Sequence, residues 1–227
     1  MPNEVIQIVL SHLDVREVWP LRETTRLFKD NIDDENTAKL FIRRDFPGKE
    51  TGGWQEYKEY HRAQQADLQA QNNQALYSAA QAGDGRKCQE LLAAGAEVDC
   101  NETPLVAACI NSHVSVVKVL LEYGANPNVV IHGQDTPLKQ ASYNGNCEIV
   151  QRLLAAGAKV NYEEHTIQAL HYAASRGHPA IVQALLAAGA NRYLYDSLGK
   201  SALKYAQSTN TSKHRWAARL LRQHIPE

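Results

Sequence analysis

A six-residue segment, LLAAGA, occurs three times in this chain, at residues 91–96, 153–158 and 185–190, and a variant, LLEYGA, occupies residues 120–125. A second signal, TPL or QAL, begins twenty-one residues before the glycine of each copy. Self-similarity at a period of about 33 residues is typical of solenoids, in which each unit buries its apolar face only by stacking on its neighbours. The segment contains no nucleophile, acid, base or metal ligand, so it predicts a recurring packing element and not four catalytic sites.

The unit at residues 136–161, TPLKQASYNGNCEIVQRLLAAGAKVN, predicts two short helices joined by a turn. Thr136 suits the N-cap of the first helix, where its hydroxyl accepts from a first-turn amide, and Pro137 suits the next position because no donor is needed there. We expect Gly145 and Gly157 to end the two helices in the left-handed conformation. The second helix carries an apolar stripe that needs a neighbouring unit to cover it. The stripe consists of Ile149, Val150, Leu153 and Leu154.

These residues resemble the ankyrin repeat, whose signature is TPLHxA, over roughly residues 74–227, although His171 alone matches the histidine of that signature. The resemblance implies a solenoid of helix pairs with short β-hairpin fingers between them. It also implies a C-terminal cap with a polar outer face. The implied units lie near residues 74–102, 103–135, 136–167 and 168–200, and the cap occupies residues 201–227.

In an ankyrin stack the first helices and the finger tips line the concave side, so the resemblance places a protein-binding surface there. Tyrosine and arginine dominate binding hot spots, and the finger at 126–135, NPNVVIHGQD, has an apolar tip that indicates a contact. The alternative is that individual tyrosines and valines pack only against neighbouring repeats. The predicted substrate-binding residues are Val106, Ile110, Val129, Ile131, Lys139, Tyr143, His171, Tyr172, Arg176 and Tyr205.

Residues 1–47 do not follow the repeat. Their first segment, MPNEVIQIVLSHLD, places apolar residues on one helical face and resembles the start of an F-box. The later segment KLFIRRDFP, at 39–47, is similar to the one that often follows that motif. Residues 48–73 are expected to form a linker with a polar helix, and the alternative for residues 1–47 is a helical cap on the stack. The resemblance implies docking residues at Pro2, Val5, Ile6, Val9, Leu10, Leu13, Val18, Leu21 and Phe28.

Together the two resemblances imply an all-α chain, with an F-box-like module followed by an ankyrin-repeat solenoid. F-box proteins dock on the Skp adaptor of a cullin–RING ubiquitin ligase, and their second module holds a protein substrate. Chains of this organisation also resemble effectors that intracellular bacteria deliver into host cells. The expected location is therefore the cytoplasm, or the host cytosol for an effector. The alternative function is an ankyrin-repeat scaffold or inhibitor with no link to ubiquitin.

Composition favours a binding protein over an enzyme. The formal net charge is −1, so the sequence gives no electrostatic footprint for nucleic acid, and no apolar run approaches the ~20 residues of a membrane span. No phosphate-binding loop or nucleophile motif occurs. The cysteines form no spaced pairs for zinc, which also argues against a RING domain, and we expect free thiols, no metal and no cofactor. The cysteines are Cys88, Cys100, Cys109 and Cys147.

Overall fold

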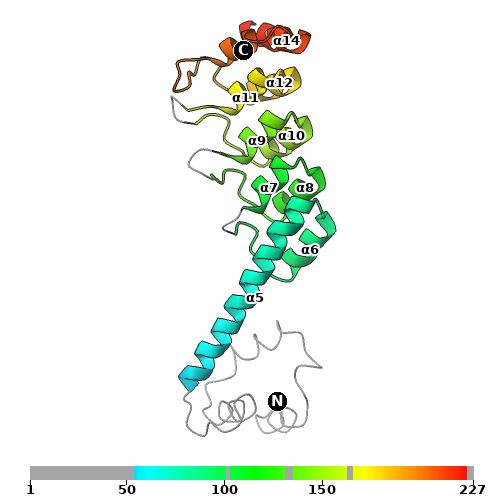
Figure 1. Ribbon diagram of the computed structural model, residues 1–227, viewed down its shortest axis with the longest axis vertical. Helices are drawn as coiled ribbons and strands as arrows, with labels where there is room; N and C mark the ends of the chain where they lie inside the picture. Colours follow the sequence, from blue (N-terminus) through cyan, green and yellow to red (C-terminus); the bar gives the residue numbers. More distant parts are fainter. Residues whose placement is uncertain (1–53, 101–102, 131–134, 163–165, 224–227) are drawn as a thin grey trace. The chain divides into compact units, whose positions relative to one another are not determined.

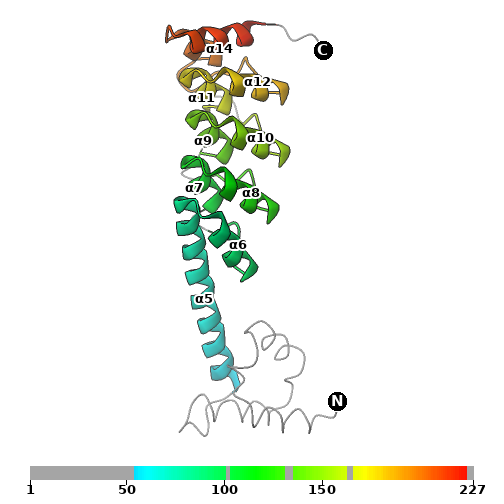
Figure 2. The ribbon, with the colours of Figure 1, turned by 90° about the vertical axis from the view of Figure 1, so that its right-hand side faces the viewer.

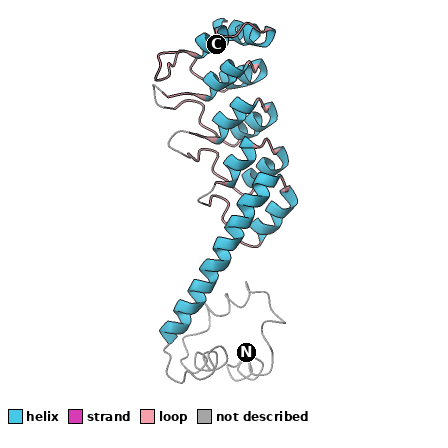
Figure 3. Cartoon of the chain, viewed as in Figure 1, coloured by secondary structure: helices cyan, strands magenta, loops and turns pink. Residues whose placement is uncertain are grey.

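The computed structural model describes residues 54–100, 103–130, 135–162 and 166–223, and this part of the chain consists of helices joined by loops (Figure 1, Figure 3). The helical fold class is therefore confirmed for the described residues. The helices are α5 (Trp54–Ala82), α6 (Gly85–Ala93), α7 (Pro104–Ile110), α8 (Val114–Glu122), α9 (Pro137–Asn144), α10 (Cys147–Ala155), α11 (Ala169–Arg176), α12 (Pro179–Ala187), α13 (Ala202–Gln207) and α14 (Ser212–Arg222).

The chain divides into two compact units, Met1–Asp67 and Leu68–Glu227. The predicted F-box-like domain at 1–47 lies outside the described residues, together with all of its predicted docking residues from Pro2 to Phe28. That part of the domain organisation stays a prediction. The elements that can be examined belong mainly to the second unit.

Within the second unit the helices form two layers. In one layer α7, α9, α11 and α13 pack on one another in succession, and in the other α6, α8, α10, α12 and α14 do the same (Figure 2). The fingers, which are the loops that precede the helices of the first layer, extend on the side of that layer (Figure 1). We call the surface formed by the first layer and the fingers the inner face, and the surface formed by the second layer the outer face.

The repeated LLAAGA segment ends each helix of the second layer in the same way. In the copy at 185–190, the amide of Gly189 donates to the carbonyl of Leu186 at 3.0 Å, and the amide of Ala190 donates to Leu185 at 2.9 Å. These two bonds satisfy carbonyls that have no partner inside the helix, and the arrangement requires a positive φ at the glycine. The first leucine and the final alanine of each copy are buried. The four glycines have φ values of 98° (Gly95), 85° (Gly124), 85° (Gly157) and 86° (Gly189).

The first helix of the third unit, α9, has the predicted ends. The hydroxyl of Thr136 accepts a hydrogen bond from the amide of Lys139 at 3.3 Å, and Pro137 occupies the first turn. Gly145 ends the helix at φ 83°. These local signals determine where the helix begins and ends, because each one satisfies or removes a backbone group that the helix leaves without a partner.

At three turns between paired helices, a glycine lies directly against a histidine ring of the next helix pair. A Cβ atom placed on Gly145 would lie 2.5 Å from Cε1 of His178. In the second unit Ser112 takes this position, at φ 59°, and the outer helix of the following unit begins after Asn146 instead of a histidine. A histidine ring therefore accompanies a turn that carries no side chain. The other such pairs are Gly83 with His113 and Gly177 with His214.

Polar side chains in the fingers join each unit to the next. Asn128 accepts a hydrogen bond from the amide of Lys159 at 2.7 Å and donates one to the carbonyl of Gly157 at 3.2 Å. Asn161 repeats this arrangement one unit further along, and Asp99 is the corresponding acceptor one unit earlier. The fingers are thus held in register by bonds between neighbouring units.

Helix α5 provides the first contacts of this series. Gln69 donates to the carbonyl of Gly95 at 2.9 Å, and Asn73 accepts from the amide of Glu97 at 2.9 Å. The two side chains share one helical face because they are four residues apart. The polar helix predicted within 48–73 and the first helix of the repeats are therefore one continuous helix, and α5 takes the place of a preceding finger.

The fingers are loops in the described part of the chain, where no strand is formed. The expectation of β-hairpin fingers is therefore corrected for these residues. The fourth finger, residues 191–200, shows the reason. The carboxylate of Asp196 accepts from the amides of Leu198 at 2.9 Å and Lys200 at 2.8 Å, which closes a tight turn. One antiparallel bridge, between Tyr195 and Ser201, flanks this turn.

Candidate binding surface

Three of the predicted substrate-binding residues form one cluster on the inner face. The rings of Tyr143 in α9 and Tyr172 in α11 meet edge to face, with 5.6 Å between their centroids and 88° between their planes. The guanidinium carbon of Arg176 lies 3.8 Å from the centroid of the Tyr143 ring. Tyr172 and Arg176 share a helical face because they are four residues apart. Tyr143 and Arg176 are exposed and Tyr172 is half-buried, so this cluster is available to a partner.

Tyr205 belongs to a neighbouring polar arrangement in the last unit. Its hydroxyl donates to the carboxylate of Asp196 at 2.6 Å, and this hydrogen bond is the main reason that the pKa of Tyr205 is raised to about 12. The Nζ atom of Lys200 lies 5.6 Å from the centroid of the same ring. Tyr205 is therefore held against the base of the fourth finger, and its half-buried ring contributes only part of its surface.

His171 is buried and acts inside the protein. The amide of Gln168 donates to its Nδ1 at 3.1 Å, so its Nε2 carries the proton and donates to the carbonyl of Leu194 at 3.1 Å. Burial lowers the pKa of His171, which favours this neutral form. The prediction that His171 contacts a substrate is corrected, because its side chain connects α11 to the fourth finger.

Lys139 and Val106 are also buried, and because of this burial their assignment as substrate-contact residues is corrected. The Nζ atom of Lys139 lies 5.2 Å from the centroid of Tyr162, a residue of the third finger. Burial lowers the pKa of Lys139, and the charge of Asp135 opposes that effect. Val106 is only 1% exposed in α7, so no partner reaches it.

Ile110 and Val129, two other predicted residues, belong to the second unit, nearer the N-terminal end of the inner face. Ile110 is exposed at the end of α7, where its carbonyl and that of Cys109 accept from the side chain of Asn144. Val129 is half-buried in the second finger, beside the exposed Val130. Ile131 lies outside the described residues. The exposed Val130 belongs to the apolar segment that the sequence predicts to make a contact, and that contact stays a prediction.

The fourth finger presents exposed apolar residues that the sequence argument missed. Its segment YLYDSL, at 193–198, lies between Gly189 and the helix α13, and Tyr193 stands where the second and third fingers carry Asn128 and Asn161. The signal was present in the sequence as three large side chains around a tight Asp-containing turn. The exposed fractions are 68% for Tyr193, 56% for Tyr195 and 70% for Leu198.

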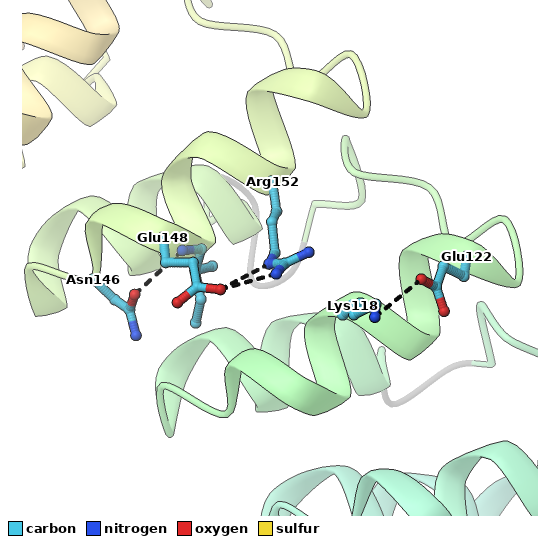
Figure 4. Close-up of polar contacts among 6 residues, drawn as sticks. Lys118, Glu122, Asn146, Glu148 and Arg152 are labelled. Atoms are coloured by element: carbon cyan, nitrogen blue, oxygen red, sulfur yellow. Dashed lines mark hydrogen bonds and ion pairs between the residues drawn. The ribbon is translucent and has the colours of Figure 1, made fainter.

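On the outer face of the middle units, charged side chains form ion pairs within the same helix. In α8, Nζ of Lys118 lies 3.8 Å from Glu122, and in α10, Nη2 of Arg152 lies 2.9 Å from Glu148 (Figure 4). These pairs join residues four apart on exposed helical surfaces. The inner face differs, because there a cation rests on an exposed aromatic ring.

The described residues contain no group of three or more His, Cys, Asp or Glu side chains that could hold a metal ion. Among the same residues, no helix has the length and apolar character that crossing a membrane requires. Burial raises the pKa of Cys88 to about 11 and that of Cys109 further, which keeps both thiols protonated. Cys88, Cys109 and Cys147 are free thiols.

The family model for ankyrin repeats (3 copies) matches residues 76–164 and, in an overlapping placement, residues 138–226. Together the two matches span residues 76–226, which is more than half of the 227 residues. No curated protein is significantly similar to the chain. The matched residues begin after the segment that resembles an F-box, so that resemblance rests on the residues of 1–47 alone. The sequence period, the paired helices and the match agree, and the chain belongs to the ankyrin-repeat family.

Proposed function

We propose that this protein holds a protein partner on its inner face, centred on the cluster of Tyr143, Tyr172 and Arg176. Ankyrin repeats imply protein–protein interaction, and this cluster is the observation that supports the location. It combines two residue types that dominate binding hot spots, and both Tyr143 and Arg176 are exposed. The exposed side chains of the fourth finger extend the proposed surface.

The experiment compares capture of partner proteins by matched variants of the full chain. Tyr143→Ala, Tyr172→Ala and Arg176→Ala should each lower the capture of the same protein by more than about fivefold, the change that a loss of about 1 kcal/mol produces. The outer-face variants Lys118→Ala and Arg152→Ala are the controls and should leave capture unchanged. Loss of capture with the outer-face variants alone would place the partner on the wrong side for this proposal.

The N-terminal segment has a proposed role of its own, which is docking on a Skp adaptor. The support is the F-box resemblance, in which Val5, Val9 and Leu10 belong to one helical face of the sequence. Each apolar side chain that is fully buried at such a contact contributes roughly 1.5–3 kcal/mol. Purified Skp adaptor should therefore bind the full chain and not the Val9→Asp/Leu10→Asp variant, while both retain the same thermal unfolding of the repeats.

With both surfaces occupied, the protein would act as a substrate-recognition adaptor in the cytosol, and catalysis would arise from proximity supplied by the assembled ligase. The buried free thiols fit a reducing compartment. A reconstitution with adaptor, cullin, RING subunit and charged conjugating enzyme should transfer ubiquitin to the captured partner, and omission of the adaptor should abolish transfer. A chain that captures its partner but never binds the Skp adaptor would be a scaffold or an inhibitor.

A further inference from the structure

Helix α14 carries four exposed cations and an exposed tryptophan, and its sequence, SKHRWAARLLR, contains no acidic residue. One side of the helix packs on α11, α12 and α13. The buried residues on that side are His214, Ala217, Ala218 and Leu221. The exposed residues are Lys213, Arg215, Trp216, Arg219 and Arg222, and Trp216 is 55% exposed.

The fold accounts for only part of this charge. Lys213 and Arg215 lie near the start of α14, where the partial positive charge of the free amides disfavours cations. At the other end of the helix, Arg192 already donates to the carbonyls of Leu221 and Gln223. Within the described residues the four cations of α14 form no ion pair, unlike Lys118 and Arg152 on the outer face. Arg219 and Arg222 lie in the last turn of α14, where the helix dipole favours cations. The dipole does not account for Lys213, for Arg215 or for the exposed ring of Trp216.

Charge is also segregated along the chain. Residues 190–227 hold seven Lys or Arg and two Asp or Glu, a formal charge of +5, whereas residues 1–189 hold seventeen and twenty-three, a formal charge of −6. The whole-chain value of −1 hides this separation. A ligand that stays at α14 meets mainly positive charge, whereas a longer polyanion that follows the stack would be repelled by the first repeat, since residues 74–102 carry −3.

We propose that Arg215, Arg219, Arg222 and Trp216 form a binding site for a short acidic segment of a partner protein. The three arginines are spaced i, i+4 and i+7, so along the helix axis they are about 6 Å and about 4.5 Å apart. Carboxylates on one face of a partner helix have the same spacing, and each can accept two parallel hydrogen bonds from a guanidinium. The ring of Trp216, three residues from Arg219, supplies an apolar contact beside the charges. This site lies in the outer layer and is separate from the Tyr143 cluster.

The experiment measures binding of the full chain to a fluorescein-labelled peptide of about 15 residues, a length at which an alanine-rich helix can form. The peptide carries Glu at i, i+4 and i+7 on an alanine background, and the comparison peptide carries Gln at those positions. The chain should bind the Glu peptide and not the Gln peptide. Arg215→Glu/Arg219→Glu should weaken binding by at least about tenfold, and Trp216→Ala by about threefold.

The matched control is Lys118→Glu/Lys159→Glu, which changes the net charge equally at two exposed lysines elsewhere. It should change affinity by less than about twofold. The neutral variant Arg215→Gln/Arg219→Gln tests whether weaker binding comes from a folding defect. It should unfold at the same temperature as the unchanged protein and should also weaken binding. Equal weakening by both charge-reversal variants, equal binding of the two peptides, or tighter binding of oligothymidine or phosphatidylserine vesicles than of the Glu peptide would each overturn the proposal. Tyr143→Ala should leave peptide binding intact, which distinguishes this site from the inner face.

Discussion

Asn161 and Asn191 are joined across two repeats, since Oδ1 of Asn161 accepts a hydrogen bond from the backbone amide of Asn191 at 2.8 Å. The side-chain nitrogen of Asn161 also donates to the carbonyl of Gly189 at 2.9 Å. One amide side chain thus satisfies a donor and an acceptor of the next unit. Such a contact couples neighbouring repeats, whose stability depends on their interfaces as well as on each unit alone.

Asn161→Ala should therefore lower the free energy of unfolding by about 1–2 kcal/mol, because two hydrogen bonds between units are lost. Tyr193→Ala is the matched control, since Tyr193 stands at the same distance from its glycine but is exposed and should matter by less than about 0.5 kcal/mol. Urea unfolding followed by circular dichroism measures both. Equal effects of the two substitutions would show that the contact does not couple the repeats.

Gly145→Ala should destabilise the protein more than Gly157→Ala does. Both glycines have a φ near 85°, so each substitution loses about 1–2 kcal/mol from backbone strain. At Gly145 the new methyl group would also lie 2.5 Å from the ring of His178, whereas at Gly157 nothing lies within 4 Å.

The double variant Gly145→Ala/His178→Ala separates the steric part from the backbone part. It should be less destabilised than the sum of the two single variants, because removal of the ring makes room for the methyl group. Urea midpoints of the four proteins complete the comparison. Strict additivity would mean that the ring moves aside without loss of stability.

The stability of the stack should fall as the pH drops below about 6.5. Burial lowers the pKa of His178 from its ordinary value of 6.5, and the positive charges of Lys213, Arg176 and His214 add to the effect. The unfolded chain then binds a proton more readily than the folded chain, so stability is complete above about 6.5 and is lost as the pH falls toward the lowered pKa. Urea midpoints at about pH 7.5 and about pH 5.5 test this, and His178→Asn should show a smaller difference. An unchanged difference in that variant would assign the pH dependence to other groups.

Alkylating reagents should modify Cys147 before the other cysteines. The thiolate is the reactive form, and burial raises the pKa of Cys88 to about 11 and raises that of Cys109 as well. Cys147 is half-buried, whereas Cys100 is buried like the first two. Mass spectrometry after brief treatment with iodoacetamide should find the label on Cys147, and urea should expose all four. Labelling of Cys109 at the rate of Cys147 would mean that α7 opens readily in the folded protein.

The helix ends and the repeat were predictable because their signals are local. Thr136, Gly145 and Gly157 each fix the backbone within a few residues, so their roles follow from sequence position alone. The continuous helix α5 was not predicted, since its course depends on the bonds that Gln69 and Asn73 make more than twenty residues away.

The arrangement of the candidate binding surface was predictable only in part. Tyr143, Tyr172 and Arg176 follow the period of the first helices, and the structure brings them together. His171 follows the same period but is buried, because its Nε2 bonds a carbonyl in the fourth finger, twenty-three residues further along. The conformation of that finger was not predictable from the repeat, and this is why the exposure of Leu198 was missed.

The pairing of turns with the rings that cover them fixes the order of the repeats. Loss of residues 113–145 by recombination within the gene would remove one whole period of 33 residues and join Ser112 directly to Asn146. The shortened chain would then place His178 over a turn that already carries a side chain. Such a shortened protein would need a compensating Ser112→Gly replacement. We therefore expect that whole repeats of this protein cannot be deleted or exchanged freely during evolution.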